Sequence, residues 1–143
     1  MPVPRPALLL GWAGVIPFAG LAAATMFGSP AEFDPRTLLL SYAALILSFM
    51  GGAQWGLTTA ALSGTERGWR GYVVSVVPAL VAWVALLIGG RAGSLVLATS
   101  FVALLAYDLW TVRNGYAPRW YASLRLQLTA AVAVLLVAAA LAA

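Results

Sequence analysis

The chain has 143 residues, of which 63% are hydrophobic and only 8% are charged, and its mean hydropathy is +0.95. A water-soluble domain carries about 25% charged residues, so this composition excludes a soluble globular protein and indicates an integral membrane protein. The net charge is +4, all basic residues are arginines, and cysteine and histidine are absent from the sequence, which excludes disulfides, thiolate catalysis, Fe–S ligation and histidine-ligated haem.

The first predicted membrane helix covers residues 7–27 and follows a short proline-broken start that carries Arg5. About 21 residues at 1.5 Å per residue are enough to cross a hydrocarbon core of about 30 Å. A cleaved signal peptide is the alternative interpretation, with Arg5 as its basic start and a cleavage site near residues 22–24. The apolar run is longer than a usual signal core and contains Pro17, so a retained helix is preferred.

Four further apolar segments follow, separated by short polar connections. Asp34-Pro35 predicts a helix start, because aspartate is a favoured N-cap and proline is favoured at the first helical position. Residues 89–93 predict a tight turn, and Asn114-Gly115 predicts a left-handed helix stop. The sequence therefore predicts a single all-α domain, a bundle of five membrane helices over residues 7–27, 37–62, 71–88, 94–112 and 119–141.

The arginines predict the orientation of this bundle. Five spans place the two termini on opposite sides of the membrane, and only Arg36 and Arg91 fall on the side of the C-terminus. The other six fall on the side of the N-terminus, namely Arg5, Arg67, Arg70, Arg113, Arg119 and Arg125. Because cytoplasmic loops carry an excess of basic residues, we expect a cytoplasmic N-terminus. Topology and lipid phosphates thus explain the basic charge better than nucleic acid does.

Small residues recur at every fourth position of the second segment, at Ser48, Gly52, Gly56 and Ala60. Such a stripe lets a neighbouring helix approach closely. It can pack inside the bundle or form a dimer face. Five spans supply many internal partners, so we expect internal packing, and on that view Gly52→Leu disrupts the fold or the assembly.

Asp108 and Arg125 are the best candidates for an intramembrane site. Asp108 lies five residues before Arg113, about 7 Å inside the fourth helix, and Arg125 lies at a similar depth in the fifth. The connection between these helices is short, so the two charges are expected to meet and to offset the cost of burial. Gln54 lies in the same half of the membrane and is a further hydrogen-bonding candidate.

Two roles stay open for this region. A structural ion pair is the simpler interpretation. A site for an anionic lipid or quinone head group is the functional alternative, because arginines and aromatic side chains gather at this interface, although the same aromatic residues also suit an ordinary interfacial belt. The residues of this candidate site are Arg113, Arg119 and Arg125 with Trp110, Tyr116, Trp120 and Tyr121.

Several motifs occur together in a known order: Leu10-Gly-Trp-Ala-Gly-Val-Ile-Pro-Phe18, Ser48-Phe-Met-Gly-Gly-Ala-Gln-Trp-Gly56, Ser75-Val-Val-Pro-Ala-Leu80, Tyr107-Asp108 and Ala117-Pro-Arg-Trp-Tyr121. The chain resembles a family of small bacterial membrane proteins classified as a domain of unknown function, to which uncharacterised animal transmembrane proteins are similar. The resemblance implies a multi-pass inner-membrane protein and brings no reaction, substrate or cofactor.

Three functions are therefore weighed. The preferred one is a non-enzymatic accessory or assembly factor that binds a larger membrane-protein complex or a lipid, without a cofactor or metal. The alternative is a small transporter or channel that uses Asp108, Arg125 and Gln54. A lipid-modifying enzyme ranks last, because histidine, cysteine and a carboxylate cluster are missing from the sequence.

Overall fold

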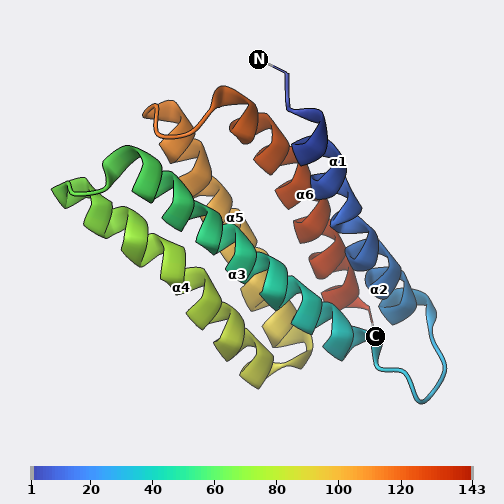
Figure 1. The fold of residues 1–143 in the computed structure, drawn as a ribbon. Coiled ribbons are helices and arrows are strands. Elements are labelled where there is room, and N and C mark those ends of the chain that lie inside the picture. Colours follow the sequence, from blue (N-terminus) through green and yellow to red (C-terminus); the bar gives the residue numbers. More distant parts are fainter. Residues whose placement is uncertain (1, 143) are drawn as a thin grey trace.

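Residues 2–142, the part that the computed structural model describes, form helices joined by short connections (Figure 1). Five helical stretches are long and apolar enough to cross a membrane, as predicted, and they span residues 5–27, 35–62, 68–88, 90–113 and 119–141. The helices are α1 (Arg5–Ala13), α2 (Val15–Phe27), α3 (Pro35–Leu62), α4 (Glu66–Ile88), α5 (Gly90–Arg113) and α6 (Arg119–Leu141).

The first membrane span is divided into α1 and α2 at Gly14. Pro17 explains the position of the break, because it has no N–H to donate to the carbonyl of Ala13 four residues earlier and its ring crowds that carbonyl. The hydroxyl of Tyr42 on α3 donates a 2.7 Å hydrogen bond to the carbonyl oxygen of Gly14. The break is therefore supported from a neighbouring helix.

The helices pack in two main pairs, α3 with α4 and α5 with α6. Helix α2 packs against both α3 and α6, so it joins the two pairs, and the two chain ends lie at opposite ends of the bundle (Figure 1). The core is aliphatic and aromatic, and its largest fully buried side chains include Phe18, Leu39, Leu47, Leu97, Phe101 and Leu136.

The predicted helix ends are present in detail. The carboxylate of Asp34 accepts hydrogen bonds from the backbone N–H and the hydroxyl of Thr37, at 3.2 and 2.5 Å. After α5, Gly115 has a φ of +80°, and the N–H groups of Gly115 and Tyr116 donate to the carbonyls of Val112 and Thr111. These two bonds form a Schellman motif, which satisfies carbonyls at the helix end.

The predicted turn over residues 89–93 is shorter in the structure. Helix α5 begins at Gly90, so Arg91, Ala92 and Gly93 are helical. Gly89 and Gly90 both have positive φ, +66° and +57°. These two glycines alone turn the chain from the end of α4 into the start of α5. A Cβ on Gly93 would lie 2.7 Å from the carbonyl oxygen of Ala85, so the absence of a side chain at Gly93 lets the start of α5 lie close to the end of α4.

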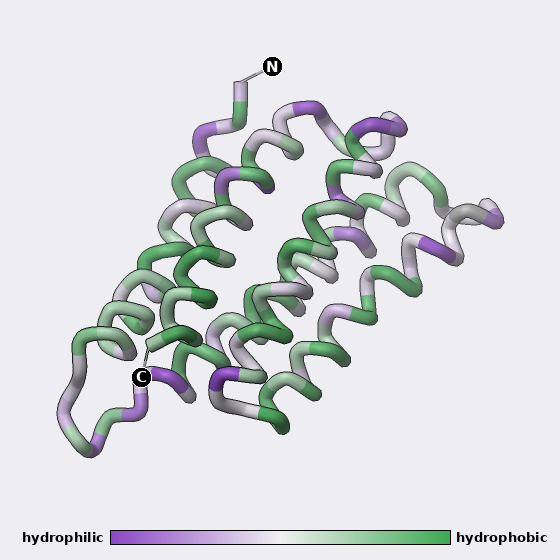
Figure 2. The backbone as a smooth tube through the Cα atoms, turned by 180° about the vertical axis from the view of Figure 1, so that it is seen from behind, coloured by the Kyte–Doolittle hydropathy of each residue, from purple (hydrophilic) through white to green (hydrophobic). Residues whose placement is uncertain are grey.

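The helices are largely hydrophobic along their lengths, and the most hydrophilic residues gather mainly toward the two ends of the bundle (Figure 2). Large hydrophobic side chains point away from the protein all along the spans, for example Leu45 with 69% and Trp69 with 76% of its surface exposed. In water such a surface would drive aggregation, but in a bilayer it contacts the acyl chains. The chain is a membrane-spanning protein.

The small-residue stripe of α3 does not pack inside the bundle, and that prediction is wrong. Gly52, Gly56 and Ala60 are exposed and Ser48 is half-buried. A Cβ on Gly52 or Gly56 would meet no other described atom within 4 Å. The neighbouring Gly51 makes the close approach instead, since a Cβ there would lie 2.8 Å from the carbonyl oxygen of Ser75 on α4. Helix α4 contacts α3 through a neighbouring face, which includes Gly51, Trp55 and Thr58.

Candidate functional site

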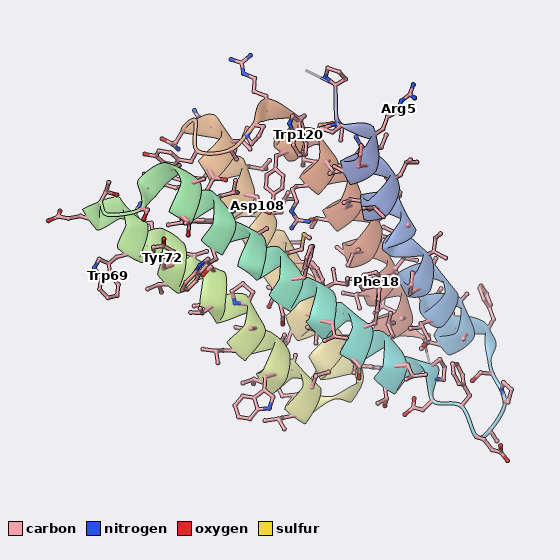
Figure 3. The ribbon with its side chains drawn as sticks, viewed as in Figure 1. Arg5, Phe18, Trp69, Tyr72, Asp108 and Trp120 are labelled. Atoms are coloured by element: carbon pink, nitrogen blue, oxygen red, sulfur yellow. The ribbon has the colours of Figure 1, made fainter. Side chains whose placement is uncertain are left out.

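Three helices meet at Asp108, which is fully buried between α3, α5 and α6 (Figure 3). Its Oδ2 atom accepts a hydrogen bond from Nε of Arg125 on α6 at 2.6 Å, which is also an ion pair. Its Oδ1 atom accepts a hydrogen bond from Nε2 of Gln54 on α3. The structure thus brings together the three polar residues that the sequence places at similar depth. We call Gln54, Asp108 and Arg125 the polar triad.

The local structure explains why these side chains meet. The Schellman motif after α5 and the start of α6 at Arg119 leave only a short connection, so the two helices run antiparallel from the same end of the bundle. The hydroxyl of Thr111 also donates to the backbone carbonyl of Asp108 at 2.6 Å. Gln54 lies on the face of α3 that also buries Gly51, Leu47 and Thr58.

The other predicted head-group residues divide between two places. Arg113 and Arg119 are exposed at the end of the bundle and do not join the triad. Trp110 forms a second cluster. Its ring stacks on that of Tyr107, with centroids 5.4 Å apart, and the guanidinium of Arg70 lies over the Trp110 ring, 5.7 Å from the ring centroid. This cation–π contact was not predicted, because Arg70 lies on α4, far from Trp110 in the sequence.

Trp120 and Tyr121 begin α6, and their rings contact each other edge to face at 6.1 Å. Tyr116 is close to Trp110, with ring centroids 5.7 Å apart. Only Tyr121 of these three lines the apolar space next to Arg125. The predicted set of interfacial residues is therefore a mixture of an aromatic cluster near α4 and α5 and a separate site along α6.

An apolar groove runs beside the polar triad, between the α1–α2 helix pair, α3 and α6. Its volume is about 410 Å³. Gly11 and Gly14 border it on one side and Tyr121, Arg125 and Thr129 on another. The apolar walls include Leu10, Val15, Phe18, Met50, Phe101 and Val132. We call this space the α6 groove, and its size and lining suit a lipid-like molecule.

Three buried polar atoms at the α6 groove have no hydrogen-bond partner among the described residues. They are Oη of Tyr121, Nη2 of Arg125 and Oγ1 of Thr129. Arg125 and Thr129 are 3% and 1% exposed. Buried polar groups are rarely left unpaired in proteins, so such atoms call for an explanation. Thr129 was missed from the sequence, because a threonine in an apolar helix usually bonds its own backbone.

The chain is similar to two animal proteins that are both named Transmembrane protein 69. The one from Xenopus tropicalis is 37% identical over 131 residues, which cover 88% of this chain and 50% of the relative. The one from Mus musculus is 26% identical over 125 residues, which cover 86% of this chain and 50% of the relative. The chain therefore spans about half the length of these curated relatives. No solved structure matches it.

The expected relation to animal transmembrane proteins is confirmed by these two relatives. A family profile matches residues 3–141, which is nearly the whole chain and includes every helix of the bundle. The polar triad and the α6 groove both lie within the matched region. The chain belongs to the family described as "Protein of unknown function (DUF3429)".

Proposed function

We propose that this protein is a non-enzymatic accessory protein of the bacterial inner membrane that binds a lipid-like molecule in the α6 groove. The observation that carries the proposal is the combination of an apolar groove of about 410 Å³ with a buried guanidinium nitrogen that has no partner among the described residues. Ligand pockets typically combine apolar walls with a few polar groups that orient the ligand.

The acidic residues support binding rather than catalysis. The sequence has four of them, and Glu32, Asp34 and Glu66 belong to connections or to the first turn of a helix. Asp108 is the remaining one, and both of its oxygens already accept hydrogen bonds from Gln54 and Arg125. A general base must lie within hydrogen-bond reach of its substrate, and the fully buried Asp108 has no exposed surface for such a contact.

Extraction of the purified protein tests this proposal. We expect a lipid-like molecule to remain bound after mild detergent purification and to be seen by native mass spectrometry. Met50 lines the α6 groove, so Met50→Trp should fill the groove and release the molecule. The matched control is Leu45→Trp on the same helix, because Leu45 is exposed on the outer surface. Equal retention by both variants would contradict the proposal.

A small transporter or channel is the second candidate function, and the polar triad is the observation that favours it. A carboxylate, a guanidinium and an amide in contact inside the membrane are typical of ion and proton pathways. The groups of the triad are 0 to 3% exposed. Transport requires this site to open, so it predicts ion-dependent melting of the protein and flux in proteoliposomes that Asp108→Asn abolishes.

A further inference from the structure

We infer that the α6 groove recognises a neutral, carbonyl-bearing head group, such as a quinone ring or an acyl ester, rather than a phosphate. This inference rests on the proposed lipid-binding function and names the chemistry of the ligand. It depends on three features of the groove: the row of unpaired polar groups along α6, the charge balance of the polar triad, and the depth of both in the membrane.

The unpaired groups form one row on α6. Tyr121, Arg125 and Thr129 follow one another at intervals of four residues, so they lie on the same face about 6 Å apart along the axis. All three line the α6 groove. The guanidinium can only donate, and both hydroxyls can donate. The wall of the groove therefore holds a line of buried donors that would suit a ligand with oxygen acceptors.

Thr129 differs from four other hydroxyl groups of the spans, although Ser94 on α5 is also buried without a hydrogen-bond partner among the described residues, away from the groove. Thr25, Ser41, Ser48 and Ser100 each donate to the backbone carbonyl four residues earlier in their own helix, at 2.7 to 2.9 Å. Thr129 is 1% exposed and makes no such bond. Its hydroxyl is thus held at the groove without the usual internal acceptor, as expected of a group that binds something else.

The charge balance determines the kind of acceptor. Arg125 already forms an ion pair with Asp108 at 2.6 Å, so the polar triad is neutral as a whole. A phosphate in the α6 groove would add a net negative charge inside the hydrocarbon region, where an uncompensated charge is costly. Arg113 and Arg119 cannot balance it from the groove, because they are exposed at the end of the bundle. A carbonyl oxygen accepts the same hydrogen bonds and adds no charge.

The depth of the site agrees with this chemistry. Arg125 lies six residues into α6, about 9 Å along the helix from Arg119. The apolar walls continue past it to Val132 and Phe18, which leaves room for a hydrocarbon tail beyond the donors. Lipid phosphates stay at the interface, whereas a quinone ring or an ester carbonyl can lie below it.

Titration of the purified protein with three probes tests the inference. The probes are decyl-ubiquinone, a diacylglycerol, and a phosphatidylglycerol with the same acyl chains, and the measurement is the dissociation constant from the rise in melting temperature. We expect decyl-ubiquinone, diacylglycerol or both to bind. Phosphatidylglycerol should bind no more tightly than diacylglycerol. Tighter binding of decyl-ubiquinone would identify a quinone ring as the preferred head group, and tighter binding of diacylglycerol would identify an acyl ester.

Removal of single hydroxyls gives the sharper test. Thr129→Val and Tyr121→Phe should each weaken the neutral probe about 2- to 12-fold, the effect of one lost hydrogen bond. Neither variant alters the polar triad, so both should fold. The matched control is Thr99→Val on α5, because Thr99 is exposed outside the groove and the change should leave binding unaltered.

Two outcomes would overturn the inference and leave the proposed function intact. In the first, phosphatidylglycerol binds more tightly than diacylglycerol and loses affinity in Thr129→Val. In the second, a neutral probe binds but neither hydroxyl deletion weakens it, which would mean that water satisfies the donors. If no probe binds and no lipid is extracted with the wild-type protein, the proposed function itself fails.

Discussion

At Asp108, several contacts offset the cost of burying a charge. The side chain has no exposed surface, yet each carboxylate oxygen accepts a hydrogen bond, one from Arg125 and one from Gln54. Such a pair is expensive to break, because the remaining partner is left charged in a low-dielectric interior. Removal of both charges together is far less harmful, because it leaves no unpaired charge in the interior.

We therefore expect Arg125→Met or Asp108→Leu alone to destabilise the protein by about 3–5 kcal/mol. The double variant should recover most of this loss, because apolar residues replace the whole pair. Denaturant unfolding in detergent measures the three free energies. If the double variant loses as much free energy of unfolding as the two single variants together, Asp108 and Arg125 do not act as a pair.

Gln54→Leu should lower the free energy of unfolding by about 1.5–3 kcal/mol, since it removes one hydrogen bond to a charged group.

The meeting of Asp108 and Arg125 could be predicted from the sequence, because the short connection between their helices fixes their relative depth. The sequence could not predict that the hydroxyls of Tyr121 and Thr129 lack a hydrogen-bond partner among the described residues. This lack depends on which way each side chain turns within its helix, and an apolar helix leaves that choice to tertiary packing. Arg113 and Arg119 show the same limit, since their proximity in sequence to Arg125 does not bring them to the groove.

At the scale of the helices, hydropathy and helix-end residues predict the spans. They do not predict which face of α3 packs inside the bundle. A membrane helix is apolar on all sides, so its sequence lacks the polar stripe that identifies the outer face of a soluble helix. Gly51, Gly52 and Gly56 therefore look equally suited to close packing. The structure selects Gly51, where Pro78 and the Ser75 carbonyl of α4 approach α3.

Gly51 and Gly52 form a matched pair for testing this packing. Gly51→Ala places a Cβ 2.8 Å from the Ser75 oxygen and 3.0 Å from Cγ of Pro78, so it should destabilise the protein by about 1–3 kcal/mol. Gly52→Ala meets no described atom within 4 Å and should be neutral or stabilising by up to about 1 kcal/mol. The melting temperatures of the two variants compare them directly. A loss at Gly52 that equals the loss at Gly51 would mean that the outer face of α3 is covered.

The start of α3 gives a pH-dependent prediction. Hydrogen bonds from the Thr37 hydroxyl and N–H lower the pKa of Asp34 below its model-peptide value of 3.8. Because the folded pKa is the lower one, this cap stabilises the folded state above pH 3.8 and the contribution is lost as the pH falls through the folded pKa. Asn also caps helices well. Asp34→Asn should therefore keep the neutral-pH melting temperature and lose less stability than the wild type on acidification to about pH 3.

At the scale of the whole molecule, the alternation of the five spans determines which connections share a side of the membrane. The N-terminus, the connection between α3 and α4 and the connection between α5 and α6 lie at one end of the bundle (Figure 1). Arg5, Arg70, Arg113 and Arg119 lie at that end, whereas Arg36 and Arg91 lie at the other. Arg36 and Arg91 both donate hydrogen bonds to the carbonyl oxygen of Ala142, at 3.1 and 3.2 Å, so they also stabilise the C-terminal end of α6.

A cytoplasmic N-terminus is expected from this asymmetry. Labelling can test it cleanly, because the sequence has no cysteine. Ser29 and Ser63 are both exposed, in connections at opposite ends of the bundle, and serine to cysteine is a small change. With the N-terminus in the cytoplasm, a membrane-impermeant maleimide should label Ser29→Cys in intact cells and should label Ser63→Cys only after the membrane is opened. The reverse pattern would invert the orientation, and it would place the polar triad and the donors of the α6 groove near the outer leaflet. Labelling of both variants in intact cells would contradict the number of spans between the two sites.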